Sequence, residues 1–240
     1  MLPMLDGKTA VVTGAGRGIG RATALALAQA GARVIAVART RADLDELAGE
    51  HGRIEPCVAD VRDADFLARI EAMGELDILV NNAGGNRPKM MVDVDDETLD
   101  WMIDLNIRSV YRVARAAARA MGRGGVIVNM SSQMGHVGSP KRTVYCMTKH
   151  AVEELTKAMA VELAPRGIRV VAIAPTFVVT PMTQGMFEDP AFRQFVYDMV
   201  PLNELPAPED IAQSILFLVS PGARFVTGDS LRVDGGWTAR

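Results

Sequence analysis

The stretch Thr13-Gly14-Ala15-Gly16-Arg17-Gly18-Ile19-Gly20 joins a short β-branched run to an Ala/Leu-rich helical pattern. Glycine lets the chain turn sharply and lets a ligand approach the backbone. The helix that follows presents free N–H groups and the positive end of its dipole, which suit a pyrophosphate. An ordinary glycine-rich turn is the alternative, but four glycines between positions 14 and 20 favour a phosphate cradle after the first strand.

The rest of the chain alternates short apolar runs with helical patterns, joined by short connections. Strands are expected at Thr9–Thr13, Arg33–Val37, Ile54–Val58, Asp77–Val80, Val126–Met130, Arg169–Ala174 and Ser230–Val233. Helices are expected at Ile19–Ala30, Asp43–Glu50, Ala64–Met73, Thr98–Met121, Val144–Leu163 and Pro208–Val219. This order predicts an α/β fold, a Rossmann-like doubly wound parallel sheet of seven strands with helices on both faces. The pattern shows no linker and no repeat, so residues 1–240 are expected to form a single domain.

The composition limits the class of protein. The 240 residues are 49% hydrophobic and 23% charged, with a net charge of −3, which is typical of a globular chain and argues against nucleic-acid or polybasic membrane partners. Cys57 and Cys146 are expected to be unpaired thiols in a reducing compartment. No apolar run approaches the ~20 residues of a membrane span, and the first eight residues do not resemble a signal peptide. A cytoplasmic location is therefore expected.

Two stretches interrupt the alternation, and both follow strands. In an open parallel sheet, ligands bind at the carboxyl ends of the strands. Thr176–Pro206 is expected to be a mobile lid over a substrate, although a helical pair covering the core would fit as well. Its apolar members are Met182, Met186, Phe187, Phe192, Phe195 and Met199. Within the other stretch, Gly84–Asp95, Met90 and Met91 are expected to form the opposite wall.

The end of the second strand bears on the choice of cofactor. An acidic residue there would bind both ribose hydroxyls of NAD, but this chain has neutral Ala38 followed by Arg39. Arg39 can bind a 2′-phosphate through its guanidinium, and Arg17 in the glycine loop is placed to reach the same group. The pair favours NADP over NAD, unless both arginines are solvated surface charges.

Tyr145 and Lys149 are four residues apart on a predicted helix and therefore share a face. A nearby ammonium favours the phenolate, which makes the tyrosine a usable proton donor or acceptor. Such a pair is common by chance, but Ser132 ends the fifth strand near the same crevice, where its hydroxyl could hydrogen-bond a substrate oxygen. Asn106 lies on the apolar stripe of its helix and needs a buried partner; a satisfied core asparagine is the alternative.

The histidines do not suggest a metal site. His51, His136 and His150 lack a metal-ligand spacing. His136 lies in the loop between Ser132 and Tyr145, so it is expected either to touch a substrate or to be solvated. No metal is predicted.

Taken together, these residues resemble the short-chain dehydrogenase/reductase family over essentially the whole chain. The resemblance rests on Thr13–Gly20, on Asn81-Asn82-Ala83-Gly84, on Ser132, Tyr145 and Lys149 with Asn106, and on Val233-Asp234-Gly235-Gly236-Trp237. Within the family, the segments around Ala38–Leu44, Ser131-Ser132-Gln133 and Val144–Lys149 are most similar to dicarbonyl/L-xylulose reductases and carbonyl reductases, which use NADPH.

The resemblance implies a role for each matching residue. Tyr145 is similar to the general acid/base, Ser132 to the group that polarises the carbonyl, and Lys149 to the group that lowers the tyrosine pKa and holds the ribose. Asn106 is similar to the residue that anchors a relay water. The cofactor site implied by the family comprises Gly14, Arg17, Gly18, Ile19, Gly20, Arg39, Thr40, Asp60, Val61, Asn82, Ala83, Tyr145, Lys149, Val178 and Thr180. Thr176 stands where the family has glycine.

The resemblance therefore implies an NADP(H)-dependent oxidoreductase that transfers a hydride between nicotinamide and a small dicarbonyl, ketose or polyol. NAD(H) remains possible, as does an NAD-dependent sugar, polyol or 3-oxoacyl dehydrogenase. A non-catalytic nucleotide sensor is the alternative from a different class. By resemblance we expect a homotetramer, with a dimer as the next candidate.

Overall fold

The computed structural model describes residues 4–181 and 183–239. These residues form a seven-stranded sheet in which every neighbouring pair is parallel, in the order β3-β2-β1-β4-β5-β6-β7. The strands are β1 (Thr9–Thr13), β2 (Arg33–Ala38), β3 (Ile54–Val58), β4 (Ile78–Asn81), β5 (Gly125–Met130), β6 (Ile168–Pro175) and β7 (Ser230–Val233). The predicted doubly wound α/β fold is confirmed, and strand bounds shift by one residue at most.

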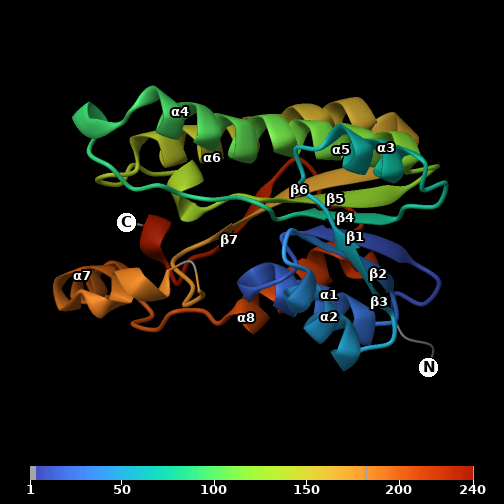
Figure 1. The fold of residues 1–240 in the computed structure, drawn as a ribbon, viewed down its shortest axis with the longest axis horizontal. Helices are drawn as coiled ribbons and strands as arrows, with labels where there is room; N and C mark the ends of the chain where they lie inside the picture. The colour runs from blue at the N-terminus through green and yellow to red at the C-terminus, as the bar shows by residue number, and fades with distance from the viewer. Residues whose placement is uncertain (1–3, 182, 240) are drawn as a thin grey trace.

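Helices cover both faces of this sheet, which lies between them as a middle layer (Figure 1). The helices are α1 (Gly18–Gln29), α2 (Arg41–Glu50), α3 (Ala64–Glu71), α4 (Asp96–Ile103), α5 (Ser109–Ala120), α6 (Thr143–Leu163), α7 (Pro190–Met199) and α8 (Pro208–Val219). The first layer contains α3, α4, α5 and α6, and the opposite layer contains α1, α2 and α8. Helix α7 lies apart from both layers at one end of the molecule.

The core follows from the period of two along each strand. In β1, Val12 packs in the cluster that contains Leu27 of α1 and Ile215 of α8. Its neighbour Val11 packs in the cluster that contains Phe66 of α3 and Val113 of α5. Successive side chains of a strand point to opposite faces, so a strand that is apolar at every position must be covered on both sides.

The helix predicted at Thr98–Met121 begins earlier and is not uniform. It consists of α4, a π-helical turn at Asp104–Arg108 and α5. A π-turn inserts one residue into the α-helical repeat and often lies at a functional site. Here the turn contains Asn106.

Candidate active site

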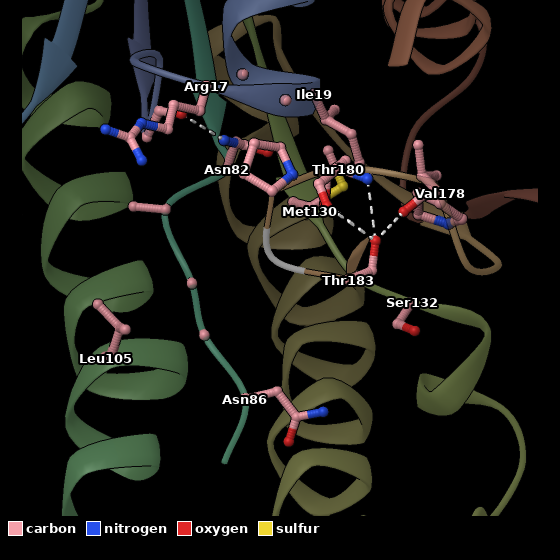
Figure 2. A pocket seen from close by; sticks show the side chains of 18 of the residues that line it. Arg17, Ile19, Asn82, Asn86, Leu105, Met130, Ser132, Val178, Thr180 and Thr183 are labelled. Carbon is pink, nitrogen blue, oxygen red and sulfur yellow. Dashed lines mark hydrogen bonds between the residues drawn. The ribbon is translucent and has the colours of Figure 1, made fainter. Parts of the chain in front are cut away.

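A cavity of about 600 Å³ lies at the carboxyl ends of the strands. All the residues expected to bind a cofactor line it: Gly14, Arg17, Gly18, Ile19, Gly20, Arg39, Thr40, Asp60, Val61, Asn82, Ala83, Tyr145, Lys149, Val178 and Thr180. Ser132 lines it too, whereas Asn106 lies behind its wall. In Figure 2, Arg17 and Ser132 lie on different sides of this cavity, and Asn86 lies on a third. The cavity is thus long enough to separate a glycine-loop end from a Ser132 end.

The glycine loop leaves the first turn of α1 available to a ligand. Helix α1 has no side-chain cap on its N-terminal N–H groups and no acidic residue in its first turn. Gly14 and Gly18 adopt positive φ angles of 67° and 54°, which side chains disfavour. A Cβ on Gly20 would overlap the carbonyl oxygen of Gly14. These features fit a phosphate-bearing dinucleotide at the positive end of the helix dipole.

Asn82 and Thr13 tie the glycine loop to the end of β4. The Asn82 side-chain amide donates to the carbonyl oxygens of Thr13 at 2.9 Å and Gly14 at 3.3 Å. The Thr13 hydroxyl in turn accepts from the backbone N–H groups of Asn82 and Ala83, each at 3.0 Å. These contacts between segments almost 70 residues apart hold the loop in the shape that the helix end requires.

The two arginines beside the glycine loop differ in their partners. Arg17 makes a bidentate pair with Asp43, at 2.8 and 3.1 Å, and this pairing holds the pKa of Asp43 below its usual value. Arg39 also lines the cavity, and no ion pair or hydrogen bond engages its guanidinium within residues 4–181 and 183–239. The sequence did not reveal Asp43, which lies 26 residues from Arg17.

Asp60 is held in place at the same end of the cavity. The guanidinium of Arg62 donates to its two carboxylate oxygens at 2.9 and 2.7 Å. This pairing with Arg62 lowers the pKa of Asp60. The carboxylate is therefore ionised at neutral pH and fixed in orientation.

Ser132 and Tyr145 meet at the other end of the cavity. Ser132 follows β5, is 9% exposed, and its hydroxyl accepts from the N–H of Met134 at 3.2 Å. Burial raises the pKa of Tyr145 to about 12, while a hydrogen bond with Ser132 and the charge of Arg142 act in the opposite direction. The phenol therefore keeps its proton at neutral pH in the cofactor-free protein, and the serine hydroxyl is within its reach.

Lys149 lies on the same face of α6 as Tyr145. Its Nζ donates to the carbonyl oxygen of Met130 at 2.7 Å and lies 5.5 Å from the centroid of the tyrosine ring. The side chain is 5% exposed. Burial lowers the pKa of Lys149 to about 8, against the opposing effect of Glu153. The hydrogen bond to Met130 anchors the ammonium at the end of β5.

Asn106 holds the loop that follows β4. Its Oδ1 accepts from the N–H of Gly85 at 2.9 Å, and its Nδ2 donates to the carbonyl oxygen of Gly85 at 2.8 Å. A weaker contact reaches the Thr148 hydroxyl at 3.3 Å. The side chain is 1% exposed, so its direct contacts are structural. They hold Gly85 in the cavity wall, and the neighbouring Gly84 is the glycine that lies beside Lys149.

Sequence reasoning missed several groups at the Ser132 end of the cavity. Arg142 and Gln133 are almost fully buried there, at 6% and 1% exposure, and both line the cavity with Asn86. The guanidinium of Arg142 donates to the sulfur of Met186 at 3.2 Å. Arg142 precedes Tyr145 by three residues, and this one-turn spacing was the available signal.

The insert is helical at its centre. Residues Thr176, Phe177, Val178, Thr180, Pro181, Thr183 and Met186 line the cavity. The ring of Phe177 packs edge-on against Phe192 of α7, with 5.4 Å between the ring centroids. Its centroid lies 5.7 Å from that of Trp237. These aromatic contacts pack α7 against the rest of the chain. Met182 lies outside the described residues. Thr176 does not have a positive φ, so its backbone does not need glycine.

One expectation about the neighbouring loops was wrong. Met90 and Met91 are 51% and 73% exposed and do not line the cavity; Trp101 and Leu105 line it instead. For His136 the structure favours the solvated alternative over a substrate contact, because the residue is exposed and does not line the cavity; its ring contacts Ser230 at 3.4 Å and Glu153 at 3.2 Å. Cys57 and Cys146 are buried and unpaired, as expected.

In residues 4–181 and 183–239, no cluster of three or more His, Cys, Asp or Glu side chains is arranged to hold a metal ion. No helix there combines the length and apolar character of a membrane span.

Known proteins are similar to this chain in sequence and in fold. The family model described as enoyl-(acyl carrier protein) reductase matches residues 14–238. The chain is 43% identical to bovine (Bos taurus) L-xylulose reductase over 98% of both chains. It is 41% identical to pig (Sus scrofa) carbonyl reductase [NADPH] 2, again over 98% of both chains. A solved structure from Beutenbergia cavernae superposes with a TM-score of 0.92 at 36% identity, over 100% of both chains; it is assigned as an NAD(P)-dependent gluconate 5-dehydrogenase and holds NADP at low occupancy.

The parallel sheet, the glycine loop and the Ser132–Tyr145–Lys149 cluster define a nicotinamide-dependent oxidoreductase that acts on carbonyl or alcohol groups. The chain belongs to the short-chain dehydrogenase/reductase family.

Proposed function

We propose that this protein is an NADP(H)-dependent reductase of small carbonyl compounds. In the reverse direction it oxidises secondary alcohols. The observation that carries the proposal is the meeting of Ser132, Tyr145 and Lys149 in the cavity that begins at the glycine loop. The loop and the first turn of α1 would hold the pyrophosphate. Asp60, Val61 and Asn82 would lie beside the adenosine, and Lys149, Val178 and Thr180 beside the nicotinamide ribose and carboxamide.

Each side chain then has a role in moving a proton or holding an oxygen. The nicotinamide, when bound, supplies or accepts the hydride. Tyr145, whose pKa of about 12 keeps the phenol protonated, donates its proton to the carbonyl oxygen during reduction. Ser132 donates a hydrogen bond to the same oxygen as negative charge develops. Lys149 holds a positive charge near the phenol, and Asn106 shapes the wall beside it, where a relay water would be anchored.

The preference for NADP rests on two residues. Arg39 forms no salt bridge in the described chain and acts on Asp60 only as a more distant charge, and the residue at the end of β2 is the neutral Ala38. Replacement Arg39→Asp should raise the KM for NADPH at least ~10-fold, the value of a lost charge-assisted hydrogen bond, with little change for NADH. Arg41→Asp is the matched control, because Arg41 pairs with Asp45 away from the cavity. An unchanged ratio of kcat/KM for the two cofactors would remove the argument for the 2′-phosphate.

Dicarbonyls, ketoses and polyols are the proposed substrates. The names of the bovine and pig relatives support this choice. An NAD-dependent sugar, polyol or 3-oxoacyl dehydrogenase is the second candidate, and the matching family model favours keeping the acyl substrates in the panel. The relatives are named reductases, which speaks against a non-catalytic nucleotide sensor.

The central test is turnover of a carbonyl and alcohol panel, read by nicotinamide absorbance with each cofactor. Tyr145→Phe should abolish turnover and retain NADPH binding, measured by nucleotide fluorescence. Tyr111→Phe is the matched control, because it removes a phenol hydroxyl from an exposed tyrosine of α5 outside the cavity. It should change neither turnover nor NADPH binding. If the wild-type protein binds NADPH and turns over nothing in the panel, the enzymatic proposal fails.

We further propose that residues 1–240 act as one catalytic domain with a substrate lid at 176–206, in a cytoplasmic homotetramer. Exposed Tyr111, Met147 and Val161 on α5 and α6 support association through these helices, with a dimer as the simpler outcome. Sedimentation of the purified protein distinguishes monomer, dimer and tetramer.

A further inference from the structure

Arg142 is a charged group buried in the wall of the cavity without a counter-charge. It is 6% exposed, and no carboxylate pairs with it in residues 4–181 and 183–239. The first turn of α6, which Arg142 caps, contains no acidic residue. By contrast, Arg17 and Arg62 line the same cavity and pair with Asp43 and Asp60.

The present contacts of Arg142 do not compensate its burial. A guanidinium has five N–H donors, and a thioether such as that of Met186 is a weak acceptor. Burial lowers the pKa of Arg142, and only the Tyr145 and Cys146 side chains act against this. A buried charge without a partner is costly, and this cost falls when an opposite charge arrives with well-formed hydrogen bonds. In a ligand cavity, the ligand is the natural source of that charge.

The position of Arg142 assigns the missing charge to the substrate. Arg142 acts electrostatically on the Tyr145 phenol and touches Met186 in the insert. The glycine loop that suits the cofactor phosphates is at the end marked by Arg17, on a different side from Ser132 (Figure 2). A dinucleotide held by that loop would therefore place its phosphates away from Arg142.

Further polar groups in the wall of the same cavity lack partners and would suit hydroxyls. The side-chain oxygens Asn86 Oδ1, Gln133 Oε1 and Thr176 Oγ1 are buried, and in the described structure none has a hydrogen-bond partner. All three residues line the cavity. Substrate hydroxyls could donate to these oxygens, because a buried polar atom is expected to find a partner in the complete complex.

We propose that Arg142 binds a carboxylate of the substrate, so that the enzyme acts on small hydroxylated oxo acids and the corresponding hydroxy acids. This inference rests on the proposed carbonyl reductase function and narrows it. The carboxylate would pair with the guanidinium, and the reacting carbonyl would lie between Ser132 and Tyr145. In the reduction, the hydride is transferred to the carbonyl carbon, and the Tyr145 phenol donates its proton to the carbonyl oxygen.

The test compares four- to six-carbon oxo acids with their methyl esters, using NADPH and the full-length protein. An ester keeps the carbonyl and removes the charge. Wild type should favour the acids by ~10- to 100-fold in kcat/KM, the range expected for a desolvated ion pair with hydrogen bonds. Arg142→Met should bring the ratio near one, mainly by raising KM for the acids. Arg142→Lys should keep part of the preference. Lys141 is the exposed residue before Arg142. Lys141→Met removes one positive charge, as Arg142→Met does, and should leave the acid-to-ester ratio of kcat/KM unchanged.

Three results would overturn the inference. The first is a wild-type enzyme that uses acids and esters equally well; this decides the question even if Arg142→Met does not fold. The second is an Arg142→Met variant that keeps the preference. The third is an equal loss on acids and esters with a shifted pH profile, which would assign Arg142 to the tyrosine alone. Turnover of neutral diketones without acid preference defeats only this inference, whereas NADPH binding without any turnover defeats the proposed function.

Discussion

Replacing Lys149 by methionine should stabilise the cofactor-free protein while removing a group of the proposed active site. Burial lowers the pKa of Lys149 from 10.5 to about 8. Each pKa unit corresponds to ~1.4 kcal/mol, so keeping this ammonium in the folded protein costs about 3 kcal/mol at neutral pH. The variant loses the hydrogen bond to Met130, worth ~1 kcal/mol. The expected net gain is about 2 kcal/mol, or about 5 °C in Tm for a chain of this length.

The pH dependence gives the sharper measurement. The folded wild-type protein releases the Lys149 proton near pH 8, and the unfolded chain releases it near the ordinary pKa of 10.5. Between these values the unfolded state binds more protons, so the wild-type free energy of unfolding rises with pH relative to that of the variant. The stability gap, which is the free energy of unfolding of Lys149→Met minus that of wild type, should therefore be largest at pH 7 and smaller at pH 10.

Chemical denaturation at matched protein concentration, without nucleotide, measures this gap. Lys157→Met is the control, because Lys157 is exposed on the same helix and pairs with Glu154; its effect should stay within ~0.5 kcal/mol. The reasoning is refuted if Lys149→Met destabilises the protein at pH 7, or if the gap widens toward pH 10. Loss of turnover in the variant would add support for its proposed role in the active site.

Three further outcomes are expected. Gly20→Ala should weaken NADPH binding at least ~10-fold, since the added Cβ overlaps the Gly14 carbonyl oxygen; an unchanged Kd from nucleotide fluorescence would contradict this. Asn106→Leu should lower the free energy of unfolding by ~2–3 kcal/mol, because it leaves the Gly85 amide group buried without its partners; a urea midpoint equal to that of wild type would count against it. In the cofactor-free protein, Tyr145 should remain un-ionised through pH 10, given its pKa of about 12; a tyrosinate signal below that pH in the absorbance difference between wild type and Tyr145→Phe would show otherwise.

The main features of the fold could be read from the sequence because they depend on local residue preferences. The glycines at 14, 18 and 20 are required by backbone angles and close contacts at their own positions. Strands that are apolar at every position predicted a sheet covered on both faces, and the two core clusters confirm it. The helical spacing of Tyr145 and Lys149 was likewise sufficient to place them on one face.

Other features depended on contacts that no local pattern encodes. The apolar period from Thr98 to Met121 predicted one continuous helix, yet a π-turn at Asp104–Arg108 brings Asn106 onto Gly85. The insert looked apolar enough to cover a substrate, but part of it packs on Trp237 near the C-terminus, through Phe195.

The amino-acid sequence by itself determined the parallel α/β fold, the phosphate-binding loop and the proposed proton-transfer residues. Only the tertiary structure decided which charges in the cavity are neutralised. Arg17, Arg39 and Arg142 are alike as residue types, but Arg17 meets Asp43, whereas Arg142 is buried without a carboxylate partner in the described structure. Ion pairing depends on distances across the folded chain, and those distances are set by how the layers pack.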